Sequence, residues 1–141
     1  MEYVCDAPPD TWFRLISHPE ALEETRLMEH TVERYFKESY ENARQAFVPP
    51  SGGRFIEQSI GLKDFIQRTM PMFLTLRDRE GNALVTAMLP PQGKPHAGFR
   101  PIIVGKANSD PYPTYGDRIE ALSRHLRLPL ERERCFPYQR G

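Results

Sequence analysis

Residues 72–89 read MFLTLRDREGNALVTAML, and this stretch decides the fold class. Its first six residues alternate in the two-residue period of a β-strand, and residues 83–89 form a second apolar run. Between the two runs, Asp78 and Gly81 occupy the first and last positions of a type I turn, and Asn82 follows. The stretch therefore predicts a β-hairpin.

Upstream of the hairpin, residues 18–47 predict one long amphipathic helix. Ser17 is a favourable N-cap, Glu20 completes a capping box with it, and Pro19 suits the first helical turn. Apolar residues then recur every three or four positions as far as Phe47, without an intervening glycine or proline. At 1.5 Å per residue, about 28 residues of such a helix would span about 42 Å, which exceeds the diameter of a domain of this size. Part of its apolar stripe is therefore expected to seek a partner.

Shorter elements complete the prediction. Asp10 can cap a short helix over residues 10–16, and Pro49, Pro50 and two glycines place a loop at 48–53. Residues 54–70 favour a helix that breaks at Gly61. Residues 101–105 favour a short buried strand, and a further helix is expected from Thr114 until Pro129 stops it.

This order of elements is typical of the α+β class. We expect the long N-terminal amphipathic helix and the shorter helices to pack on a small, mainly antiparallel sheet of about three strands. All 141 residues fit a single domain. Its helical part would cover about 9–70, its hairpin, strand and C-terminal helix about 71–130, and a charged tail 131–141.

The charge of the chain is unevenly distributed. Residues 1–47 hold ten acidic and five basic residues, a net charge of −5, whereas residues 48–141 hold nine acidic and fourteen basic residues, a net charge of +5. No apolar run is long enough to span a membrane, and residues 1–6 do not resemble a signal peptide. We therefore expect a soluble, cytoplasmic protein. Whether Cys5 and Cys135 pair stays open.

No familiar catalytic or cofactor-binding motif occurs in the sequence, so we expect no cofactor, no metal and no catalytic residue, and leave open whether the chain is an enzyme. His30 and Glu33 could supply only two metal ligands from one helix. Cys135 and His125 would form a nucleophile and base only if the fold brought them together. The arginines of the basic half alternate with acidic residues, which argues against nucleic-acid binding.

One loop has the composition of a ligand site. Residues 92–100 contain two glycines, which permit close approach of the backbone, together with Lys94, His96 and Arg100. Lys106 follows the next predicted strand. These cations suit a phosphate or a carboxylate.

Two hypotheses of function follow. The first is a non-catalytic interaction or regulatory domain that binds a protein partner, or forms a homodimer, through helix 18–47. The alternative is a small enzyme or ligand-binding domain for an anionic small molecule at the 90–106 region. A flat apolar strip along the helix would favour the first hypothesis, and a pocket with converging cations would favour the second.

Overall fold

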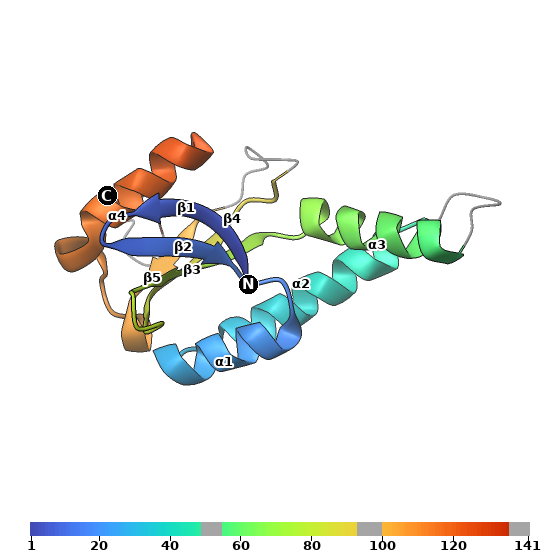
Figure 1. Ribbon diagram of the computed structural model, residues 1–141, viewed down its shortest axis with the longest axis horizontal. Coiled ribbons are helices and arrows are strands. Elements are labelled where there is room, and N and C mark those ends of the chain that lie inside the picture. Colours follow the sequence, from blue (N-terminus) through green and yellow to red (C-terminus); the bar gives the residue numbers. More distant parts are fainter. Residues whose placement is uncertain (49–54, 93–99, 136–141) are drawn as a thin grey trace.

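The computed structural model describes residues 1–48, 55–92 and 100–135 (Figure 1). Within these ranges the α+β class is confirmed, because four α-helices accompany a five-stranded antiparallel sheet of order β1-β2-β3-β4-β5. The strands are β1 (Glu2–Ala7), β2 (Asp10–Arg14), β3 (Met72–Arg77), β4 (Ala83–Leu89) and β5 (Ile102–Val104). The helices are α1 (His18–Met28), α2 (Val32–Ala46), α3 (Phe55–Thr69) and α4 (Tyr112–Leu126), with short 3-10 turns η1 (Lys106–Asn108) and η2 (Arg132–Arg134).

The predicted hairpin forms the centre of the sheet. Strands β3 and β4 pair with Leu74 opposite Ala87 and Thr75 opposite Thr86. In the connecting turn, the Gly81 amide donates to the Asp78 carbonyl at 3.1 Å, and Gly81 has a φ of 84° that favours glycine. The turn that Asp78 and Gly81 predict in the sequence is therefore present.

The expected helix at residues 10–16 is wrong, because residues 10–14 form strand β2. This strand pairs with β1 on one side and with β3 on the other. A helix of seven residues has too few internal hydrogen bonds to be stable alone, whereas two neighbouring strands satisfy the backbone here completely. Trp12 is fully buried and its indole N–H donates to the Arg118 carbonyl at 2.9 Å. The expected three strands thus become five.

The expected continuous helix 18–47 is also wrong. The capping box is present at its start, where the Glu20 amide donates to the Ser17 hydroxyl and the Glu20 carboxylate accepts from the Ile16 amide. However, the chain reverses after Met28, because Glu29 adopts a left-handed conformation with a φ of 54°. The Thr25 hydroxyl then accepts from the Glu33 amide at 2.9 Å and so caps α2 from the preceding helix.

Two other boundaries differ from the prediction. Helix α3 runs through Gly61, so the predicted break there is wrong; the space beside Gly61 would admit a side chain at ordinary contact distance from Phe47. Helix α4 begins at Tyr112, just before the expected Thr114, and ends at Arg127 in a left-handed C-cap. The chain next buries Leu128, Leu130 and Cys135 against the core.

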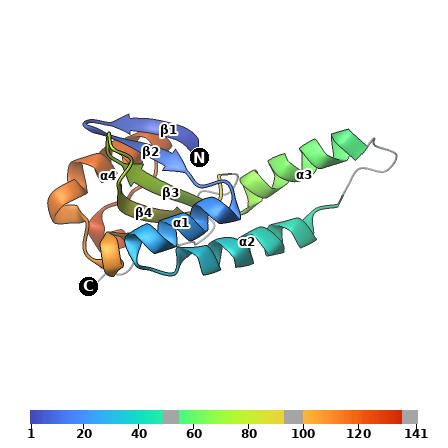
Figure 2. The ribbon, with the colours of Figure 1, turned by 60° about the horizontal axis from the view of Figure 1, so that its bottom comes forward.

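Both faces of the sheet are buried (Figures 1 and 2). Met72, Leu74 and Leu76 of β3 point into a core cluster that α4 covers, whereas Phe73 points into a second cluster with residues from α2 and α3. A sheet covered twice needs apolar residues at successive positions of its central strands. This explains why 72–76 and 85–89 lack polar positions apart from two threonines.

Helices α2 and α3 lie side by side as an antiparallel pair that extends beyond the sheet (Figure 2). The rings of Phe47 and Phe65 contact each other with centroids 5.4 Å apart. We call this pair the helical arm. In the described part of the chain, no helix combines the length and the apolarity needed to cross a membrane.

A buried polar network fixes α1 on the sheet. The Glu24 carboxylate is fully buried; one oxygen accepts from Arg77 at 2.7 Å and the other accepts from the Thr86 hydroxyl at 2.5 Å. The Arg77 guanidinium also donates to Thr75 and to the Gly81 carbonyl. Each partner of the carboxylate lies on β3 or β4, so the network joins α1 to the central hairpin.

His30 extends this network at the turn between α1 and α2. Its Nε2 lies 2.9 Å from the Thr86 hydroxyl, and its Nδ1 accepts from the Val32 amide. Because the single Thr86 proton is donated to Glu24, Nε2 must carry the proton that bonds Thr86. The ring is therefore neutral, with both nitrogens engaged. Burial lowers the pKa of His30, and the charge of Glu24 opposes this shift.

We predict that Glu24→Ala destabilises the fold by about 3–5 kcal/mol, because it leaves the buried Arg77 without its carboxylate. Urea unfolding followed by circular dichroism measures the change. The matched control is Glu23→Ala on the same helix, which removes an exposed pair with Arg26 and should cost less than about 0.5 kcal/mol. Equal costs for the two variants would show that the network does not hold α1.

We also predict that His30 makes the fold sensitive to acid. Its folded-state pKa lies below the ordinary 6.5, so the unfolded state binds its proton first. The stability that His30 contributes is complete above pH 6.5 and is lost as the pH falls from there through the folded-state pKa. Unfolding free energies measured from pH 8 to pH 4.5 should fall less steeply in His30→Gln than in the wild type. His125→Gln, at an exposed position, should retain the wild-type slope; an unchanged slope in His30→Gln would contradict the assignment.

Candidate functional site

The predicted loop site remains a prediction. Lys94 and His96 lie outside the described residues. Arg100 and Lys106 are exposed and flank β5, so the whole strand separates them. Of the four cations, the described residues include these two, and they lie at opposite ends of β5.

The other residue pairs considered from the sequence are separated by the fold. His30 is buried against Thr86, whereas Glu33 contacts His18. Among the described residues, no group of three potential ligands could hold a metal ion. Both cysteines are free thiols in the core beneath α4. Burial raises the pKa of Cys135, while His125 is exposed, so this pair lacks the arrangement of an activated nucleophile.

The residue that stands out is Arg14, at the end of β2. Only 6% of it is exposed. Its Nη2 donates to the Gln67 carbonyl at 2.5 Å, in the last turn of α3, and its Nη1 lies 3.5 Å from the Gln92 side-chain oxygen. Burial lowers the pKa of Arg14, and the charge of Glu2 opposes this shift. An arginine nevertheless stays charged at neutral pH.

Arg14 has no ion pair within the described ranges of the chain. The other two arginines at the sheet do: Arg77 pairs with Glu24, and Arg118 pairs with Asp10. The acceptors of Arg14 are instead a neutral carbonyl and a neutral amide. Since buried charges are usually paired, a buried guanidinium without a carboxylate is the feature that calls for a functional explanation.

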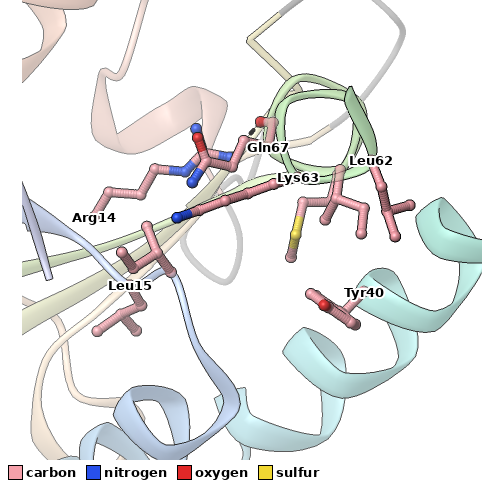
Figure 3. Close-up of a pocket in the computed structure, with 9 residues that line it drawn as sticks. Arg14, Leu15, Tyr40, Leu62, Lys63 and Gln67 are labelled. Carbon is pink, nitrogen blue, oxygen red and sulfur yellow. Dashed lines mark hydrogen bonds between the residues drawn. The ribbon is translucent and has the colours of Figure 1, made fainter. Parts of the chain in front are cut away.

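Arg14 lines a pocket of about 280 Å³ between β2, α2 and α3 (Figure 3). We call it the Arg14 pocket. Its walls are mostly apolar, and they carry three polar side chains besides the Tyr40 hydroxyl. The lining residues are Arg14, Leu15, Ile16, Tyr40, Leu62, Lys63, Ile66, Gln67 and Met70. An apolar cleft with a few convergent polar groups is the usual form of a small-molecule site, and this volume is at the lower end of such sites.

Helix α3 supplies the second cation of the pocket. Positions 62, 66 and 70 recur every four residues and form an apolar row, and positions 63 and 67 form a polar row beside it. Lys63 is exposed, and Figure 3 shows its side chain extending from α3 towards Arg14 and Leu15. The pocket thus has a cationic end, at Arg14 and Lys63, and an apolar remainder.

The sequence prediction missed this site for a physical reason. The two rows of α3 were visible in the sequence as four-residue spacings. However, Arg14 was assigned to a helix, and only the pairing of β2 with β3 places it beside the end of α3.

No model of a known protein family matches the chain, and neither the curated proteins nor the solved structures include a significant match to it.

Proposed function

We propose that this chain is a ligand-binding domain for an anionic small molecule with an apolar body, and that the ligand occupies the Arg14 pocket. The observation that carries the proposal is the buried guanidinium of Arg14, which has no carboxylate partner in the described ranges and faces an apolar pocket. A bound anion would supply a countercharge in direct contact, which Glu2, lining another hollow with Arg14, does not provide. Lys63 would add a second, flexible cation at the same end of the pocket.

The proposed ligand is anionic, as in the alternative hypothesis from the sequence, but we place it in the Arg14 pocket and not at the 90–106 region. The loop around Lys94, His96 and Arg100 remains an alternative location. Gln92, which precedes that loop in the sequence, approaches Arg14.

We propose binding rather than catalysis for this pocket. Among the described residues, its lining contains no carboxylate, histidine, cysteine or serine, which are the usual acids, bases and nucleophiles of enzymes. Arg14 and Gln67 are already positioned by each other. Groups that are fixed before the ligand arrives lose little entropy on binding, which favours affinity.

The test is thermal unfolding in the presence of a panel of alkyl and aryl carboxylates and phosphates. A ligand that binds the folded state should stabilise it by about 2.7 kcal/mol at one hundred times its dissociation constant. Lys63→Glu, at an exposed position, should reduce this stabilisation because it places a negative charge at the cationic end.

Arg79→Glu is the matched control, since this exposed residue of the turn between β3 and β4 is not among the residues that line the pocket. It should respond to the ligands as the wild type does. If no member of the panel stabilises the wild type, or if the two variants respond alike, the Arg14 pocket is not the site.

The second candidate function is the protein contact expected for residues 18–47, with a second copy of this chain as the partner. It is favoured by the helical arm, which extends beyond the sheet, and by Tyr35 and Tyr40 of α2, which are 47% and 37% exposed. The apolar stripe itself is used inside the molecule, because Val32, Phe36 and Ala43 are buried. The remaining contact surface is therefore small.

For this second candidate we expect a concentration-dependent dimer in gel filtration with light scattering. Tyr35→Lys should shift the dimer towards the monomer, because it places a charge on the proposed contact. Glu38→Lys, an exposed position on the same helix without an aromatic ring, is the matched control. A strict monomer at high concentration would rule out the homodimer.

A further inference from the structure

The ligand class can be narrowed from the geometry of the Arg14 pocket; this inference rests on the function proposed above. Two questions decide the class: how much negative charge the cationic end accepts, and where the apolar part of the ligand lies.

The cationic end suits one negative charge. The Arg14 guanidinium already donates to the Gln67 carbonyl, which lies in the last turn of α3. The carboxyl end of a helix carries a partial negative charge, which offsets part of the attraction that Arg14 and Lys63 exert on an anion. A carboxylate needs only two donors for its two oxygens, and the free guanidinium N–H groups and Lys63 can supply them.

The apolar part of the ligand has a path out of the pocket. A second hollow of about 360 Å³ lies beside the first and is lined by Ile16, Ser17, His18, Phe36, Lys37, Tyr40 and Glu41. Ile16 and Tyr40 line both spaces. These two large side chains are 36% and 37% exposed, so the boundary between the two spaces is itself an exposed apolar surface.

Because the Arg14 pocket and the second hollow adjoin each other, together they suit a ligand with a long, narrow apolar group better than one with a compact group. A compact ring would fill the Arg14 pocket and cover Ile16 and Tyr40 from that side alone. A chain that crosses them would cover both side chains and continue along α2, and the hydrophobic effect rewards each methylene group that it removes from water.

We propose that the ligand is a straight-chain aliphatic monocarboxylic acid. Its carboxylate is bound by Arg14 and Lys63, and its hydrocarbon chain lies between α2 and α3 and crosses Ile16 and Tyr40 into the second hollow.

The experiment is isothermal titration calorimetry of the full chain with hexanoate, octanoate, decanoate and dodecanoate, each below its micelle concentration, and with octyl phosphate and octanol. Affinity should rise about fourfold for each methylene group that becomes buried, which corresponds to about 0.8 kcal/mol per group. Octanoate should bind more tightly than octyl phosphate and than octanol. Lys63→Met should weaken octanoate at least fivefold and leave octanol unchanged.

A second variant tests the path of the chain. Glu41 is exposed and lines the second hollow but not the Arg14 pocket, so Glu41→Trp should obstruct that hollow without disturbing the Arg14 pocket. It should weaken dodecanoate at least tenfold and hexanoate less than twofold. Glu38→Trp on the same helix is the control, because Glu38 lines neither space, and it should leave both affinities unchanged.

The outcomes separate the two proposals. If octyl phosphate binds more tightly than octanoate, the monocarboxylate assignment is wrong and the anion-binding function stands. If affinity stops rising at octanoate, or if Glu41→Trp weakens both acids equally, the proposed path is wrong. If no anionic compound binds, the proposed function and this inference are both wrong.

Discussion

The structure depends on the β3–β4 hairpin, which is buried on both faces. Leu74 and Leu76 face α4, whereas Phe73 and Thr75 face the opposite side of the sheet. One helix cannot cover both faces, so the fold needs two separate covers. The chain provides the first by inserting α1, α2 and α3 between β2 and β3, and the second by placing α4 after β5. The position of every helix follows from this requirement, and so does the existence of a seam between β2 and α3, where the Arg14 pocket lies.

The three inserted helices bring the Glu24 carboxylate into a buried position, and the hydrogen bonds of the Glu24 network offset the cost of its desolvation. Helix α1 presents a carboxylate to the sheet, where desolvation would be costly without partners. Arg77 and Thr86 provide them from adjacent strands, and His30 completes the set from the turn before α2. Because these bonds have directions, they fix the orientation of α1 and the place where the chain reverses. A purely apolar contact would permit α1 to slide along the sheet.

The elements that could be predicted from the sequence are those whose causes are local. The hairpin has its turn residues at 78–82, and α1 has its capping box at Ser17 and Glu20. The errors concern elements whose causes are distant. Trp12 pairs with Cys5 of β1 and also with Leu76 of β3, which lies 64 residues further along, so the local sequence does not show that β2 is an inner strand of the sheet. The reversal at Glu29 likewise needs no glycine or proline, since it depends on His30 reaching Thr86 of β4. Predicting the Arg14 pocket requires both the local sequence of α3 and the distant pairing of β2 with β3.

The choice of arginine at position 14 illustrates how structure and proposed function are connected. The Gln67 carbonyl needs a donor, because the last carbonyls of a helix lack internal partners. A lysine could meet that need alone, with a single point charge. A guanidinium has five N–H groups in a fixed plane, so it can hold the end of α3 with one edge and still present donors to the pocket with another. On the function proposed here, Arg14 therefore keeps its acceptors at Gln67 and Gln92 and binds the anion with its remaining N–H groups. Binding an anion would not require the end of α3 to be released, and the site could stay preorganised through each cycle of binding.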